Sequence, residues 1–229
     1  MKRIALLLAA MCFTLLAGSL AFGTTLTIVA PALVAQQYQQ TYNSPCIFGD
    51  PSCKQPAGFG DPTSIAGGGS PQNWGVPTPV ASPTYTGTQI MNAIGSYGFI
   101  VGIDVNQAGS YKEPTTWPTL TYFDEYINGG LVASYGTAGA TTGGTALNVV
   151  NNGNGYADDL ITGFVAPTLG TDTVTFHLTY LNATDGTEEF FLVNTASPPP
   201  TVPEPASLTL FGTGLASIAG IIRKRRKLQ

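Results

Sequence analysis

Short runs of alternating apolar and polar residues dominate the chain from about Gln89 onward. The two clearest runs carry apolar side chains at every second position: Tyr97, Phe99, Val101, Ile103 and Val105 in the first, and Val174, Phe176, Leu178 and Tyr180 in the second. A period of two is that of a β-strand, in which successive side chains point to opposite faces. Each run therefore predicts a strand with one buried face.

Shorter candidate strands occur in residues 119–126, 131–135, 145–150, 159–165 and 189–193. Turn-forming Asn, Asp and Gly residues separate them, at 128–130, 143–144, 152–153 and 185–186. No amphipathic helix of useful length is apparent. About seven or eight short strands with regular turns predict an all-β fold, an antiparallel β-sandwich of jelly-roll type over residues 87–196.

Residues 24–86 have a different composition, in which Pro and Gly recur and no long alternating run occurs. A Gly-Gly-Gly-Ser-Pro sequence at 67–71 is typical of a flexible linker. We therefore expect this segment to be mostly irregular, and either to lie over the domain or to stay mobile.

The first residues have the pattern of a secretory signal peptide, which we assign to residues 1–23. Lys2 and Arg3 precede an apolar stretch, and small residues follow it. Cleavage after Ala21 and cleavage after Gly23 both fit these small residues. The alternative, an uncleaved membrane helix, is disfavoured because the stretch is short for a span of about 20 residues. The pattern predicts export through the Sec translocon.

The last residues have the pattern of a membrane anchor. Residues 206–222 contain no charge, and as a helix they would be roughly 26 Å long, slightly less than the ~30 Å hydrocarbon core. A basic cluster that favours the cytoplasmic side follows at once: Arg223, Lys224, Arg225, Arg226 and Lys227. The alternative, a buried core helix, seldom runs into such a cluster. We expect a C-terminal transmembrane helix with the domain on the outer side.

A Pro-Glu-Pro tripeptide stands directly before this apolar stretch, in the sequence Val202, Pro203, Glu204, Pro205. With the stretch and the basic cluster, residues 202–229 resemble the PEP-CTERM sorting signal. The resemblance implies recognition by an exosortase in a Gram-negative bacterium that makes exopolysaccharide, and transfer of the domain to the cell surface or extracellular matrix. A Pro-rich spacer at 197–201 would hold the domain away from the lipid.

The strand region resembles, more loosely, the cargo regions of other PEP-CTERM proteins. The similar segments are 103–106, 153–159 and 185–191. This resemblance implies a sandwich and no particular activity.

The charges are distributed unevenly along the chain. Between residues 24 and 205, Lys54 and Lys112 stand against all thirteen acidic residues, so this exported part has a net charge of about −11. So acidic a protein is not expected to bind nucleic acid or anionic lipid. The charge suits cations and neutral sugars as partners.

Two cysteines, Cys46 and Cys53, lie in the exported part. An oxidising compartment favours a disulfide, and two cysteines allow one pairing. We expect a Cys46–Cys53 disulfide that closes a local loop rather than a metal site.

Candidate catalytic groups are few. His177 is the single histidine, and its alternation with Phe176 and Leu178 places it on the solvent face. No Gly-x-Ser-x-Gly sequence occurs, so no catalytic residue of a nucleophilic triad is expected. The acidic pairs at 124–125, 158–159 and 188–189 cannot form dyads as neighbours, because adjacent residues of a strand point to opposite faces. We expect them to be solvated or turn carboxylates.

The segment 152–159 is the best candidate for a ligand site, since it is rich in Asn, Asp and Gly. Oxygen side chains at near-alternate positions suit a hard cation, so we consider calcium bound by Asn154 with Asp158 or Asp159. The alternative is a plain Asn-Gly turn that leads into a strand. No other cofactor is indicated.

Several aromatic residues are candidates for stacking on sugars or for filling the core: Tyr85, Tyr97, Tyr111, Trp117, Tyr122 and Tyr126. The sequence favours a non-enzymatic surface or matrix protein that binds extracellular polysaccharide or other copies of itself. The alternative is a secreted carbohydrate-active enzyme with a carboxylate pair from distant parts of the chain.

Overall fold

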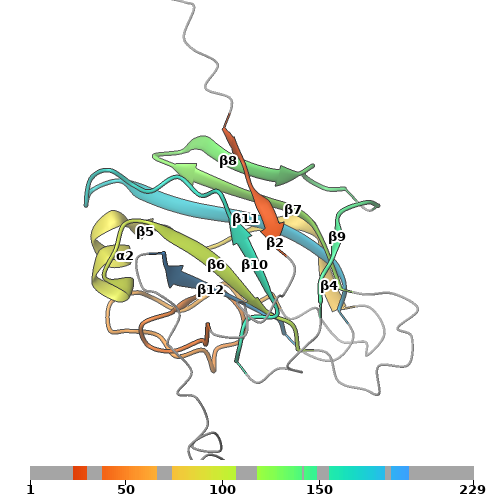
Figure 1. The fold of residues 1–229 in the computed structure, drawn as a ribbon, viewed down its shortest axis with the longest axis horizontal. Coiled ribbons are helices and arrows are strands. Elements are labelled where there is room, and N and C mark those ends of the chain that lie inside the picture. Colours follow the sequence, from red (N-terminus) through yellow and green to blue (C-terminus); the bar gives the residue numbers. More distant parts are fainter. Residues whose placement is uncertain are drawn as a thin grey trace, which may run out of the picture. The chain divides into compact units, whose positions relative to one another are not determined.

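Two facing β-sheets form the fold (Figure 1). The structure, a computed structural model, describes residues 23–29, 38–65, 74–106, 118–140, 142–148, 155–183 and 187–195. All of these residues belong to one compact unit. The two-sheet architecture confirms the predicted all-β class, while the jelly-roll type stays a prediction.

The larger sheet has seven strands. Its main path, in spatial order, is β1 (Thr24–Thr25), β8 (Gly130–Gly136), β7 (Thr119–Ile127), β11 (Thr173–Ala183) and β4 (Trp74–Ala81). Two further strands pair at its ends, β5 (Tyr85–Thr86) with β11 and β9 (Thr145–Ala146) with β7. The pairing of β1 with β8 is parallel, and the others are antiparallel.

The smaller sheet has five strands, and all of its pairings are antiparallel. Its spatial order is β2 (Thr27–Val29), β10 (Asp159–Thr162), β6 (Phe99–Asp104), β12 (Glu189–Asn194) and β3 (Cys46–Phe48). Because β6 lies between β10 and β12, residues far apart in sequence meet at its end.

Phenylalanine rings from both sheets fill the space between them. Phe123 of β7 packs edge-on against Phe48 of β3, with 6.2 Å between ring centroids, and stacks on Phe190 of β12 at 6.1 Å. Phe176 of β11 packs against Phe99 of β6 at 5.7 Å. The apolar positions of the two clearest sequence runs are buried from Phe99 to Val105 and from Val174 to Tyr180, which confirms both strands.

Residues 24–86 are more ordered than the sequence suggested. Five of the strands in the described part, β1 to β5, come from this segment and pair in both sheets. Ile47, Phe48 and Ile65 are fully buried. Most of the described residues of this segment lie outside the five strands, in line with the prediction of a mostly irregular segment, but the strands make the segment part of the folded unit. Strands of two or three residues are too short to show a period.

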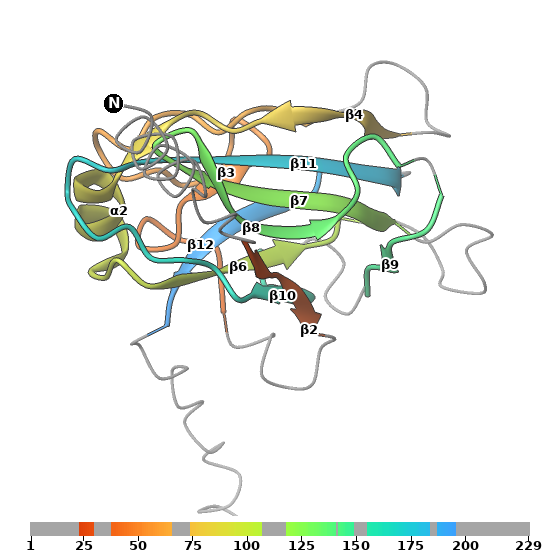
Figure 2. The ribbon, with the colours of Figure 1, turned by 90° about the horizontal axis from the view of Figure 1, so that it is seen from above.

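A helix that the sequence analysis did not predict, α2 (Gly87–Ile94), lies at one end of the sheets (Figure 2). It begins with a capping box, in which Thr86 and Gln89 each bind the other's backbone amide. It ends at Gly95, whose φ of 73° is the left-handed conformation that favours glycine. Both signals are visible in the sequence, but a helix of eight residues is too short for its apolar pattern to stand out from the strand region that follows.

The predicted membrane segments lie outside the described residues. Among the residues that the structure does describe, no helix is long and apolar enough to span a membrane. The expected signal peptide, apart from Gly23, and the expected helix at 206–222 both fall outside them.

Candidate functional site

The outer face of the larger sheet carries a row of polar and aromatic side chains. In the register of β7 and β11, three pairs share this face: Tyr122 with Thr179, Asp124 with His177, and Tyr126 with Thr175. The alternate residues, such as Phe123 and Phe176, are fully buried in the core. We call these six outward residues the polar face.

Asp124 is the centre of the polar face. Its Oδ2 accepts hydrogen bonds from the hydroxyls of Tyr122, at 2.7 Å, and Tyr126, at 3.3 Å. Burial raises the pKa of this carboxyl, and the two hydroxyls and the charge of His177 partly oppose that shift. Its Oδ1 is buried and has no hydrogen-bond partner among the described residues.

Tyr126 and His177 are the accessible rings of this face. Their centroids lie 4.6 Å apart and their planes are tilted by 38°. Both side chains are partly exposed. The outward direction of His177 confirms the sequence prediction, since Phe176 and Leu178 on either side are fully buried.

A serine lies on the same face but away from the histidine. Ser134 of β8 pairs with Asp124, which pairs on its other side with His177. Ser134 and His177 are therefore two strands apart, roughly 9–10 Å between backbones at the usual strand spacing. The face offers hydrogen-bonding and stacking groups, and this serine and histidine do not make the contact of a catalytic triad.

The other aromatic candidates are divided between the core and the surface. Tyr85 is fully buried and stacks on Phe59 with 4.4 Å between centroids, so it belongs to the core. Tyr97 is partly exposed. Tyr111 and Trp117 lie outside the described residues.

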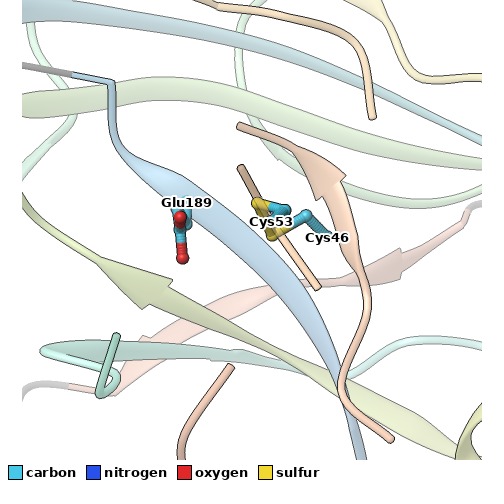
Figure 3. Close-up of side chains that lie close together, drawn as sticks. All are labelled: Cys46, Cys53 and Glu189. Atoms are coloured by element: carbon cyan, nitrogen blue, oxygen red, sulfur yellow. A yellow bond between two sulfur atoms is a disulfide. The ribbon is translucent and has the colours of Figure 1, made fainter. Parts of the chain in front are cut away.

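The disulfide predicted from the sequence, Cys46–Cys53, is present. Its sulfurs and the carboxylate of Glu189 lie within 4.8 Å of one another (Figure 3). Sulfurs bonded to each other are not thiolates, so this group is not a metal site. The disulfide packs with Ala157, Leu160 and Phe191 in an apolar cluster on the outer side of the smaller sheet.

The candidate calcium ligands Asp158 and Asp159 accept hydrogen bonds from nearby residues. Asp158 Oδ2 accepts from the amide of Val105 at 2.9 Å. Both carboxylate oxygens of Asp159 accept hydrogen bonds from Asn148. Oδ2 accepts from its backbone N–H at 2.6 Å, and Oδ1 accepts from its side-chain amide at 2.7 Å. Asn154 lies outside the described residues, so the calcium set of Asn154, Asp158 and Asp159 stays a prediction.

The acidic pairs are more buried than the sequence suggested. Asp124, Glu125, Asp158, Asp159 and Glu188 are all at most 4% exposed, so the prediction of solvated carboxylates is wrong for them. Glu125 points inward between the sheets and accepts from the amide of Val165 at 2.9 Å. Burial raises its pKa to about 8, although this hydrogen bond lowers it. Alternation places Glu125 and Asp124 on opposite faces, as expected.

Two acidic residues that the sequence analysis did not select, Asp104 and Glu189, complete an acidic region at the end of the smaller sheet. They pair directly across β6 and β12. Burial and the charge of Asp158 raise the pKa of Asp104 to about 7. The sequence shows an acid at the end of each run, but only the strand register shows that they meet.

The fold and the polar face define a two-sheet all-β protein with a polar, aromatic outer surface. Residues 201–226 match the PEP-CTERM protein-sorting motif, so the chain is a PEP-CTERM domain-containing protein. The matched residues include the sorting tripeptide Pro203–Pro205 and most of the basic cluster, and they lie outside the described part. Comparisons with curated proteins and with solved structures each found no match.

Proposed function

We propose that the two-sheet domain is a non-enzymatic module that binds neutral polysaccharide outside the cell. The PEP-CTERM motif supports an exported protein that an exosortase sorts by way of a membrane-anchored precursor. Export through the Sec translocon of a Gram-negative bacterium and display in an exopolysaccharide matrix are parts of the same proposal.

The Tyr126–His177 pair carries the proposal. Two partly exposed rings 4.6 Å apart, on a sheet that holds their backbones rigidly, offer apolar ring faces on which a sugar ring can stack. Thr175 and the Tyr126 hydroxyl border this surface, and the Tyr126 hydroxyl, which donates to Asp124, keeps its acceptor lone pairs. A sugar hydroxyl can donate a hydrogen bond to it.

Charge favours a neutral polymer over an anionic one. The exported part carries about −11, with two lysines against thirteen acids. Such a field repels uronic acids and sulfated sugars and leaves neutral hexose polymers unaffected. Asp124, beneath the two tyrosines, adds a local negative charge to the same surface whenever it is ionised.

A glycan array with the purified full-length chain, run beside a hydrolysis screen on the same polymers, tests the binding proposal. We expect neutral glycans to bind without turnover. Turnover would replace the proposal by the alternative of a carbohydrate-active enzyme. Self-association with no glycan bound would replace it by a matrix protein that assembles from its own copies.

Matched tyrosine variants locate the binding surface. Tyr126→Ala should weaken glycan binding roughly tenfold, which corresponds to about 1.4 kcal/mol. Tyr42→Ala is the control, because Tyr42 is 63% exposed and lies outside the polar face. Equal affinity in both variants would show that the polar face is not the binding surface.

The sorting function has its own test. Replacing Pro203, Glu204 and Pro205 by alanine should leave the precursor in the inner membrane at its unprocessed size, as seen on a blot of fractionated cells. Unchanged size and release would contradict exosortase processing of this chain.

A further inference from the structure

The end of the smaller sheet gathers three carboxylates that the proposed function does not use. Asp104 is the last residue of β6, and Glu189, the first of β12, is its direct partner in the register. Side chains directly opposite in an antiparallel pair lie on one face within contact range, and like charges there are destabilising. Asp158 comes just before β10 and donates its backbone amide to Ile103 of β6 at 2.6 Å.

Backbone amides hold two of these carboxylates in place. The amide of Gly155 donates to Asp104 Oδ2 at 2.7 Å, and that of Val105 donates to Asp158 Oδ2 at 2.9 Å. Each of the two segments thus donates a backbone amide to a carboxylate of the other: Gly155 to Asp104, and Val105 to Asp158. Asp104 and Asp158 are 3% and 0% exposed.

Asp104 also has an oxygen without a partner. Its Oδ1 is buried and accepts no hydrogen bond from any described residue. A buried, unpaired carboxylate oxygen is costly, because the water that served it in the unfolded chain is not replaced. The charges of Asp158 and Glu189 both act on this carboxyl and raise its pKa further.

The described part of the chain offers these carboxylates little positive charge. Lys54 is the single lysine or arginine of the described part; it is exposed, and its charge acts on Glu189. Within the described part of the chain, the negative charge of Asp104 can be compensated by a proton or by a bound cation.

We propose that Asp104, Asp158 and Glu189 bind a divalent cation of the calcium type at this end of the smaller sheet. Calcium takes oxygen ligands in flexible geometry, and extracellular modules bind it with dissociation constants of roughly 10⁻⁴–10⁻³ M. The oxygens of these three carboxylates do not all lie within 4.8 Å of one another, so the proposal requires the side chains to move closer when the ion binds.

This site differs from the one that the sequence suggested. Asp159 pairs with Ile103, a core residue, and so lies on the inner side of the sheet. Both of its oxygens are already bound by Asn148. Asp104 and Glu189 take its place as candidate ligands. The inference does not depend on polysaccharide binding by the polar face.

Calcium titration of the full-length chain, freed of metal with a chelator, tests the site. Thermal unfolding at pH 8 should shift upward with calcium concentration, because an ion that binds the folded state alone stabilises it. Titration calorimetry should show saturable heat in the same concentration range. Magnesium should act more weakly, since it demands stricter geometry. No shift and no heat with millimolar calcium would overturn the proposal.

Asp104→Asn is the decisive variant, because the asparagine oxygen can still accept from Gly155 while the charge is gone. We expect it to unfold at a higher temperature than the parent in chelator, and to lose at least roughly tenfold in calcium affinity. Asp172→Asn is the control, since Asp172 is also buried but binds Asn128, Thr168 and Leu169.

The two variants separate a specific site from a general effect of the ion. Asp172→Asn should keep the full calcium shift, whatever its own stability. An equal shift in Asp104→Asn and the parent would overturn the assignment of Asp104. Should Asp104→Asn fail to fold, Glu189→Gln gives the same comparison, because Glu189 is only partly buried.

Discussion

The outer faces of the two sheets differ in what covers them. On the larger sheet, Tyr126 and His177 of the polar face remain partly exposed. On the smaller sheet, Phe191 is fully buried beneath the disulfide-bonded segment. Packing there is close: a side chain at Gly102 would meet the Phe191 ring at 2.7 Å. The smaller sheet therefore has apolar packing on both sides, whereas Tyr126, His177 and Thr175 form the part of the polar face that is accessible to a partner.

The strongest test of this difference is a truncation beneath the disulfide. Phe191→Ala should destabilise the protein by about 3–5 kcal/mol, as expected for a buried phenylalanine. Denaturant unfolding measures the change. A loss below about 1 kcal/mol would mean that the outer cluster is loosely packed and that this face is closer to a free surface.

Removal of the disulfide should have the next largest effect. Cys46→Ser with Cys53→Ser should cost about 2.5 kcal/mol, because the bond restricts a short loop of the unfolded chain. Reduction of the parent protein should reproduce the loss in denaturant unfolding. An unchanged midpoint in both experiments would show that the covering segment does not depend on its bond.

The buried carboxylates predict lower stability at higher pH. In the unfolded chain carboxyls lose their protons near pH 4, whereas in the folded chain Asp159, Asp104 and Glu125 keep theirs up to pKa values of about 6, 7 and 8. The folded state therefore binds more protons between about pH 4 and pH 8. Across that window in chelator we expect the free energy of unfolding to fall as the pH rises, with no further loss above it.

Glu125→Gln separates the core carboxyl from those at the sheet end. This variant should flatten the upper part of the pH profile, while the part due to Asp104 and Asp159 remains. Unfolding midpoints measured at several pH values check the slope. A stability that rises with pH in this window would contradict the raised pKa values.

The smallest change in stability is expected on the polar face. Tyr126→Ala should alter the unfolding free energy by no more than about 0.5 kcal/mol, as is usual for surface positions. The same protein should show the loss of glycan affinity given above. A loss of several kcal/mol would mean that Tyr126 serves the fold and would make its effect on binding uninformative.

Part of this difference between the faces is visible in the sequence. In β11 the apolar residues alternate with Thr175, His177 and Thr179, which is the pattern of a strand with one wet face. In β12 the apolar residues run without interruption through residues 190–193, and β6 has a similar run at 99–103. Such runs are typical of strands buried on both faces. The alternation of residues 97–105 nevertheless led us to predict one buried face for that strand, and the covered outer face was not predicted.

The candidate sites were predicted less completely. The disulfide was predicted because the exported part has two cysteines and an oxidising compartment favours their bond. The outward direction of His177 was predicted because successive side chains of a strand point to opposite faces. Asp104 and Glu189 were missed because their contact depends on the register of β6 with β12, strands that are separated by most of the domain. The burial of Glu125 was missed because its neighbour Asp124 suggested a solvated pair.

The sequence by itself determined the sorting motif, the all-β class, the main strands and the disulfide. Each depends on local order: a tripeptide beside an apolar stretch, a period of two, or two cysteines in an exported chain. Tertiary structure decided which outer face stays open, which short strands of residues 24–86 join the sheets, and which carboxylates meet. Those outcomes depend on contacts between distant residues, whose free energy no local pattern records.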